Sequence, residues 1–129
     1  HRDLHRVVRR QRQMCKETVL APCPRGWRSD GAETIDLARE AVNTGYWPLF
    51  EVEDGEYRLT YRPSYKRPLI PWLKKQGRFA HLFKPGNEET LLDLEAWVDS
   101  EWDKLLRRCG EPSEADWQEY LQSSGCLLR

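Results

Sequence analysis

An Asp-Gly pair at residues 54–55 separates two short strand-like segments, Leu49–Glu53 and Glu56–Tyr61. A two-residue loop between such segments favours a type I′ turn, because both turn positions need positive φ and Asp-Gly tolerates it. The sequence therefore predicts a β-hairpin. This feature restricts the fold most, since the turn fixes which residues of the two strands face one another.

Charge is abundant and unevenly distributed along the chain. The 129 residues include 21 basic and 21 acidic side chains, which balance. Residues 1–28 hold eight basic and two acidic side chains, whereas residues 87–129 hold four and eleven. The length and the 11% aromatic content fit one small folded domain or a piece of a larger one. The sequence lacks an apolar run long enough to span a membrane.

The basic N-terminal segment, residues 1–17, has a helical pattern over residues 3–15. One interpretation is a nucleic-acid arm whose phosphate contacts would be Arg6, Arg9, Arg10 and Arg12. We favour a solvated amphipathic helix, because no aromatic side chain is interleaved with these arginines to stack on a base. We therefore expect no nucleic-acid or membrane partner. The absence of a secretory pattern in the first residues favours the cytoplasm.

The candidates for metal chemistry are the four cysteines, Cys15, Cys23, Cys109 and Cys126. They lack the paired spacing of a structural zinc site, and a reducing compartment makes disulfides rare, so each is by default a small buried side chain. Cys23 differs, because Pro22 and Pro24 fix φ, exclude a helix and hold the sulfur in a stiff loop. Such a loop suits a metal or cluster ligand, and it equally suits a plain turn.

Local signals predict the other elements. Glu17–Ala21 is a short apolar run ended by Pro22, which is typical of a buried strand. Helical spacing and capping residues predict further helices at residues 34–43, 71–76 and 88–108, and after Ser113. One buried strand, a hairpin and several helices place the chain in the α/β class.

No catalytic motif is complete in this sequence. It contains no GxGxxG, P-loop, HExxH or GxSxG pattern. We interpret His81 as a packed histidine rather than a general base, and the carboxylates of residues 93–103 as a solvated helix face. The tryptophans at positions 97, 102 and 117 are interpreted as packing residues. The chain is then either not an enzyme or one part of an enzyme.

Several segments resemble one known family. The resemblance is to the C-terminal part of the thiamine-diphosphate-binding beta subunit of pyruvate:ferredoxin and related 2-oxoacid:ferredoxin oxidoreductases. It is carried by Leu20–Trp27 (LAPCPRGW), Ala41–Phe50 (AVNTGYWPLF), Tyr57–Tyr61, Arg67-Pro68 and Leu73–Phe79 (LKKQGRF). The likeness covers about residues 18–83. The first two motifs at this separation are its most specific part.

The resemblance implies an activity and a set of cofactors. The family oxidatively decarboxylates a 2-oxoacid to an acyl-coenzyme A, uses thiamine diphosphate with magnesium, and passes electrons through iron–sulfur clusters to ferredoxin. Transferred to this chain, the fourth ligand of a 4Fe-4S cluster is Cys23. The GDG-type segment that holds the diphosphate and magnesium, and the three upstream cysteine ligands, have no counterpart here. We therefore expect this chain alone to bind neither cofactor.

The resemblance also implies a domain division and partners. Residues 18–86 would be the family-like domain of a thiamine-diphosphate-binding-type fold, preceded by the basic helix of residues 1–17 and followed by an acidic helical tail, 87–129. The implied partners are the rest of the beta subunit, other oxidoreductase subunits and ferredoxin. The alternative is a non-catalytic interaction or scaffold domain derived from that subunit.

Overall fold

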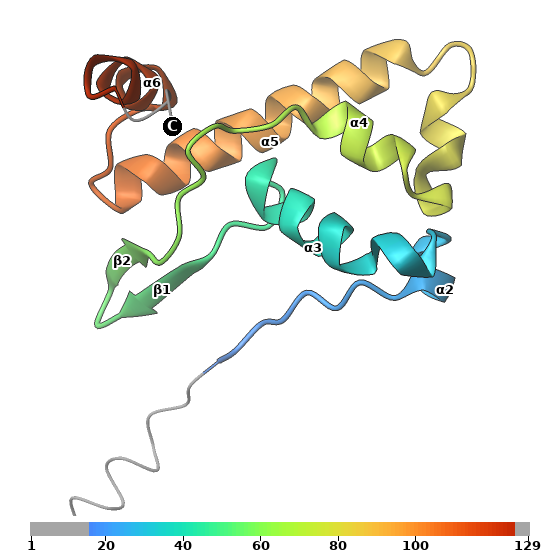
Figure 1. Ribbon diagram of the computed structural model, residues 1–129, viewed down its shortest axis with the longest axis horizontal. Helices are drawn as coiled ribbons and strands as arrows, with labels where there is room; N and C mark the ends of the chain where they lie inside the picture. The colour runs from blue at the N-terminus through green and yellow to red at the C-terminus, as the bar shows by residue number, and fades with distance from the viewer. Residues whose placement is uncertain (1–15, 126–129) are drawn as a thin grey trace, which may run out of the picture.

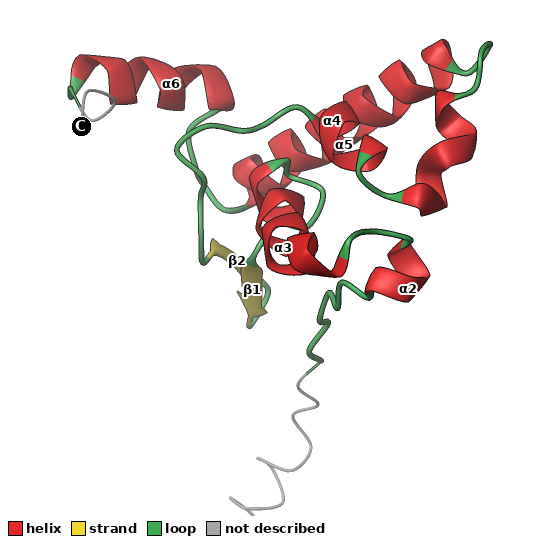
Figure 2. Ribbon diagram, turned by 45° about the vertical axis from the view of Figure 1, so that its right-hand side comes forward, coloured by secondary structure: helices red, strands yellow, loops and turns green. Residues whose placement is uncertain are grey.

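The computed structural model of the chain describes residues 16–125. It combines one antiparallel hairpin with helices, an α/β composition (Figures 1 and 2). In chain order the elements are α2 (Pro24–Trp27), the 3₁₀ helix η1 (Gly31–Glu33), α3 (Thr34–Asn43), β1 (Phe50–Glu53), β2 (Glu56–Leu59), α4 (Leu69–Lys74), the 3₁₀ helix η2 (Gly77–Phe83), α5 (Glu88–Arg108) and α6 (Glu114–Ser123). Within this range no helix is both long and apolar enough to cross a membrane. The helix predicted over residues 3–15 lies outside the described residues.

The Asp-Gly turn between β1 and β2 forms as predicted. Asp54 and Gly55 have φ values of 51° and 80°, so both lie in the left-handed region that a type I′ turn requires. The strands pair antiparallel, with Glu53 opposite Glu56 next to the turn. The hairpin is therefore specified by a local signal that the sequence shows directly.

The helix signals are confirmed at α3, α5 and α6. After α3, Gly45 has φ of 75°, a conformation that favours glycine beyond a helix end. The helix α5 begins directly after Asn87, as predicted. Ser113 caps α6, since its Oγ accepts the Asp116 amide at 3.2 Å. The helix α4 begins at Leu69, two residues before the predicted start.

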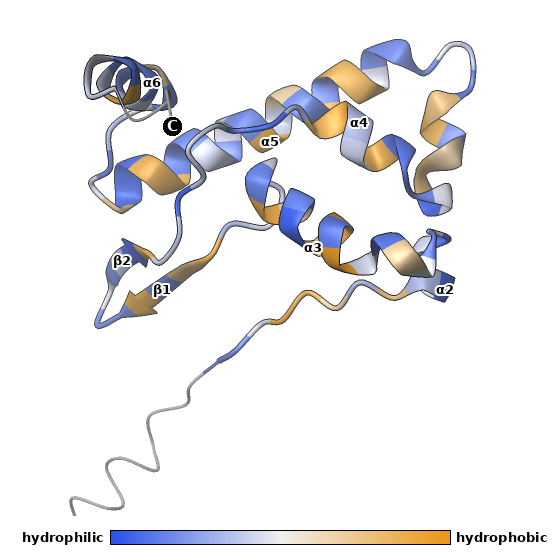
Figure 3. Cartoon of the chain, in the orientation of Figure 1, coloured by the Kyte–Doolittle hydropathy of each residue, from blue (hydrophilic) through white to orange (hydrophobic). Residues whose placement is uncertain are grey.

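The main core brings α3, α4 and α5 together around Trp72. This side chain is buried, and its Nε1 donates to Leu37 O at 2.9 Å. The apolar stripe of α5 enters the same core through Leu91 and Val98. A second cluster joins the C-terminal part of α5 to the hairpin, and Figure 3 shows the apolar residues of these elements in orange. Packing thus continues across the predicted boundary between residues 86 and 87.

The prediction of a buried strand at Glu17–Ala21 is wrong. These residues form an extended segment that runs toward α2 in Figure 1, and Val19 is 80% exposed. A buried strand needs neighbouring strands to pair its amides and carbonyls. The sheet formed by residues 16–125 contains only β1 and β2, which pair with each other. An apolar run alone does not supply that partner.

Two packing predictions are also wrong. The His81 side chain is exposed instead of packed, and Trp97 on α5 is 58% exposed. Trp102 on the same helix is 2% exposed, as predicted. Five residues of α-helix turn the side chain by about 500°, so Trp97 points about 140° away from Trp102. Only one of the two tryptophans therefore shares the buried stripe.

Candidate functional site

Cys23 is the N-cap residue of α2, a single helical turn. Its backbone is extended, with φ of −98° and ψ of 115°, and Pro24 occupies the first helical position. The Gly26 amide donates to Cys23 Sγ at 3.5 Å, and the thiol is exposed. The expectation that the two prolines exclude a helix is wrong after Cys23, because the first helical position needs no amide donor.

Trp27 anchors this turn in the core. The residue is 6% exposed, and its ring packs edge-on against Trp72 with the centroids 5.9 Å apart. The Arg78 guanidinium carbon lies 4.0 Å from the centroid of the Trp27 ring, a cation–π contact. A large buried aromatic ring with these contacts holds its backbone in place. The Cys23 sulfur, one helical turn away, therefore projects from a fixed base.

Gly77 brings the LKKQGRF motif against the same turn. Its amide donates to Arg28 O at 3.0 Å. A Cβ at this position would lie 2.7 Å from Arg28 Cβ, so glycine alone allows the close approach. Two segments far apart in the sequence thus form one unit. Sequence reasoning missed this contact, because no local pattern reports it.

Arg78 adds a fixed positive charge to this unit. Its Nε donates to Gln76 Oε1 at 2.8 Å, and the buried Gln76 in turn donates to Trp72 O at 3.0 Å. Its guanidinium also lies over Phe79, 4.6 Å from the ring centroid. Removal from water lowers the pKa of Arg78, but a guanidinium stays protonated in proteins. The ring that anchors the Cys23 turn therefore carries a cation on its face.

Among the described residues, Cys23 is not part of a complete metal site. Between residues 16 and 125, no three His, Cys, Asp or Glu side chains are grouped so as to hold a metal ion. Cys109 is half-buried at the C-cap of α5, and burial raises the pKa of its thiol, with Glu111 adding to the effect. Cys15 and Cys126 lie outside the described residues. The Cys23 sulfur is exposed on a fixed turn, so it is accessible to groups outside the described residues.

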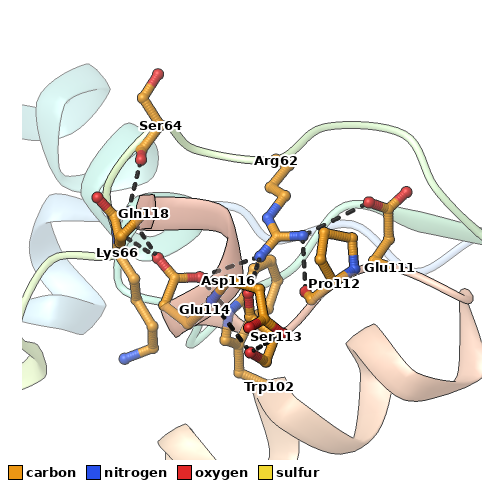
Figure 4. A network of polar contacts seen from close by, with 10 residues as sticks. All are labelled: Arg62, Ser64, Lys66, Trp102, Glu111, Pro112, Ser113, Glu114, Asp116 and Gln118. Carbon is orange, nitrogen blue, oxygen red and sulfur yellow. Dashed lines mark hydrogen bonds and ion pairs between the residues drawn. The ribbon is translucent and has the colours of Figure 1, made fainter. Parts of the chain in front are cut away.

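A separate polar network connects α6 to the segment after β2 (Figure 4). Arg62, whose side chain is 8% exposed, donates to Pro112 O at 3.0 Å and lies 3.4 Å from Glu114 Oε2. Glu114 also accepts from Trp102 Nε1 at 3.3 Å and from Gln118 Nε2 at 3.1 Å. A carboxylate that accepts from all these donors has a structural role: it holds α6 in place and is not available as a general base.

Trp117 and the acidic face of α5 also take part in packing. The half-buried Trp117 lies under the Arg62 guanidinium, whose carbon is 4.7 Å from the ring centroid, which agrees with its predicted packing role. Glu95 accepts the Leu69 amide at 2.8 Å, and Asp99 pairs with Lys66. The prediction of a solvated carboxylate face is therefore incomplete, because these two carboxylates anchor the segment that leads into α4. They line an open depression of about 450 Å³.

Comparison with known proteins identifies relatives of this chain, although no protein-family model matches it. The pyruvate synthase subunit PorB of Thermotoga maritima is 43% identical over 89 residues, which are 68% of this chain and 28% of that subunit. The PorB of Methanothermobacter thermautotrophicus is 46% identical over 79 residues, 61% of this chain and 26% of that subunit. The ketoisovalerate oxidoreductase subunit VorB of Pyrococcus abyssi is 43% identical over 91 residues, 69% of this chain and 28% of that subunit.

The chain is thus similar to subunits of oxidoreductases named for pyruvate and ketoisovalerate, both 2-oxoacids. The resemblance seen in the sequence is confirmed, and the chain matches part of a beta subunit of this class. It spans between 26% and 28% of the length of these three relatives. The match to the T. maritima subunit covers 68% of this chain, about 88 of its 129 residues. A stretch of that length includes residues 45–85 whatever its first residue is. The hairpin and Gly77 therefore lie inside the matched part.

Proposed function

We propose that the chain is the part of a 2-oxoacid:ferredoxin oxidoreductase beta subunit that supplies Cys23 as one ligand of a 4Fe-4S cluster. The complete enzyme would oxidatively decarboxylate a 2-oxoacid such as pyruvate to its acyl-coenzyme A and deliver the electrons to ferredoxin. The observation that carries the proposal is an exposed thiol on a turn fixed by Trp27 and Gly77. Similarity to oxidoreductase subunits supports it.

The residues of the turn would hold the sulfur and favour negative charge on it. An iron–sulfur cluster supplies one-electron transfer, at a potential that depends on hydrogen bonds to its sulfurs and on nearby charge. The Gly26 amide donates to the Cys23 sulfur, and a thiolate at this position would accept the bond more strongly. Arg78 places a positive charge against the Trp27 ring that anchors the same turn. Both contributions would favour the reduced cluster.

The remaining parts of such an enzyme would come from polypeptide beyond this chain. We propose that thiamine diphosphate and magnesium bind there, and that residues 18–86 complete a thiamine-diphosphate-type fold. Similarity to beta subunits that are several times longer than the matched segment supports this proposal. The partners would be the rest of the beta subunit, other oxidoreductase subunits and ferredoxin, in the reducing cytoplasm.

The test is the activity of the complex formed when the full chain is co-expressed with the neighbouring reading frames. We expect reduction of a viologen dye that depends on both a 2-oxoacid and coenzyme A. The Cys23→Ser variant should lose this activity, because a ligand of the electron path is removed. Cys109→Ala is the matched control, since this thiol is half-buried away from the surface turn, and it should retain activity.

A complex that assembles but shows no dye reduction dependent on a 2-oxoacid would contradict the proposal. That result would support the alternative, a scaffold domain that keeps the fold without the chemistry. Equal activities of the wild type and Cys23→Ser would leave the enzyme class standing and remove the ligand role.

A further inference from the structure

The two faces of the hairpin differ sharply in polarity. Directly paired residues of a β-ladder share a face, and side chains alternate along each strand. The register pairs Phe50 with Leu59 and Val52 with Tyr57, so these four apolar or aromatic side chains lie on one face. The opposite face carries Glu51, Glu53, Glu56 and Arg58. The hairpin is thus a one-sided sheet, with one face suited to burial.

The apolar face is only half covered within this chain. Tyr57 and Leu59 on β2 pack against the C-terminal part of α5. Phe50 and Val52 on β1 remain 44% and 49% exposed, although Phe50 stacks on Tyr57 with the ring centroids 6.1 Å apart. Figure 1 shows the hairpin projecting beside the C-terminal end of α5, with β1 on the side away from that helix. The β1 half of this face is therefore open to a partner.

The turn end of the hairpin, next to the open face, is acidic. Glu51 pairs with Arg58 at 2.6 Å, whereas Glu53, Asp54 and Glu56 form no ion pair with any residue in the range 16–125. These unpaired carboxylates fit a different polypeptide whose apolar patch is bordered by lysines or arginines.

We infer that the β1 half of the hairpin, centred on Phe50 and Val52, docks on the remaining polypeptide of a beta subunit, at an apolar patch bordered by basic residues. This inference rests on the proposed function. The T. maritima relative is much longer than this chain, since the matched 89 residues are 28% of it. The hairpin lies inside the matched stretch, so the same face is available in a chain that carries the missing part. Other regions of this chain would then be free for further subunits.

The test is capture of that remaining polypeptide. The probe is the set of polypeptides encoded by the neighbouring reading frames, co-expressed with the tagged full chain. We expect the wild-type chain to retain the probe. The Val52→Asp variant should retain at least about tenfold less of it, since loss of a central apolar contact typically lowers the affinity by this factor. Leu92→Asp on α5 is the control, because Leu92 is also apolar and is 61% exposed. It should retain the probe fully.

Folding and self-association are measured on the same proteins. Val52→Asp should melt within a few degrees of the wild type, since this side chain is half exposed, and Phe50→Asp serves as a second variant. No retention by the wild type, or equal retention by Val52→Asp, would overturn the inference. The inference would also be overturned if light scattering showed a wild-type dimer that the Val52→Asp substitution dissociates, because the face would then bind a second copy.

The outcome is separable from that of the proposed function. A complex that depends on Val52 but carries no iron would support this interface and contradict the proposed cluster. An iron-bearing complex that is insensitive to Val52→Asp would do the reverse.

Discussion

Gly77 packs directly against the turn that carries Cys23. Its amide bonds to Arg28 O, and its missing side chain leaves room for Arg28 Cβ, which an added Cβ would approach to 2.7 Å. Neither group can move freely, because Arg28 directly follows the buried Trp27. The position of the candidate ligand therefore depends on a glycine far from it in the sequence.

We predict that Gly77→Ala lowers the free energy of unfolding by about 1–3 kcal/mol, because overpacking forces a backbone shift. Gly31→Ala is the matched control, since a Cβ at Gly31 would meet no atom within 4 Å. The measurement is urea unfolding of both variants. Equal stabilities would show that the turn yields to the added methyl group.

The two described cysteines should differ in reactivity. Burial holds the pKa of the Cys109 thiol above its ordinary value, whereas Cys23 is exposed. We predict that iodoacetamide modifies Cys109 about tenfold more slowly than Cys23 at pH 8, because burial limits both access and thiolate formation. Mass spectrometry of the separate peptides measures both rates. Rates that are equal in the folded protein would contradict the observed burial.

The same shift has a consequence for stability. The folded state keeps the Cys109 proton to higher pH than the unfolded chain does, so it binds more protons in that range. The free energy of unfolding should therefore fall as pH rises from the ordinary thiol pKa, about 8.5, through the raised value. Cys109→Ala should remove this part of the pH dependence.

Among the elements, α5 does the most to join the molecule together. Its stripe contributes to both hydrophobic clusters, and Trp102 in addition donates to Glu114 at the base of α6. Trp97 lies on the same helix with most of its surface exposed. The two tryptophans therefore form a natural pair for testing which face of α5 is buried.

We predict that Trp102→Ala costs about 3–5 kcal/mol of unfolding free energy and that Trp97→Ala costs less than about 1 kcal/mol. The large loss follows from the cavity left by a buried indole ring. Chemical denaturation monitored by circular dichroism measures both. A loss at Trp97→Ala as large as that at Trp102→Ala would place the first ring in an interface between chains.

Elements governed by local signals could be predicted from the sequence. The Asp54-Gly55 turn, the Ser113 cap and the apolar stripe of α5 each depend on a few neighbouring residues, and the structure confirms them. The strand at Glu17–Ala21 depends on a partner strand, and the described part of the chain provides none. Its prediction failed for that reason.

The candidate site was predictable to a similar extent. The prolines around Cys23 indicated a stiff turn, and the structure places its sulfur at the surface. The contacts that hold the turn come from Trp72, Gly77 and Arg78, and only the fold brings these residues to it. The joint between Arg62 and Glu114 was missed likewise, because its partners are 52 positions apart.

At the scale of the whole molecule, the chain is a folded unit with two outward-facing features. One is the Cys23 sulfur on its fixed turn, and the other is the open apolar half of the hairpin. Each is incomplete by itself: a single thiol holds no cluster, and a half-covered sheet face favours a partner. The matched segments are 28% of the T. maritima and P. abyssi relatives, which are therefore several times longer than the matched part.

The most direct test of this account is the iron content of the purified complex with Cys23→Ser in place of the wild-type chain. The complex should lose about four iron atoms per copy of the chain, since one 4Fe-4S cluster loses a ligand. Cys109→Ala should lose none. Identical iron contents in the wild type and Cys23→Ser, with both complexes fully assembled, would contradict the assignment of Cys23 as a cluster ligand.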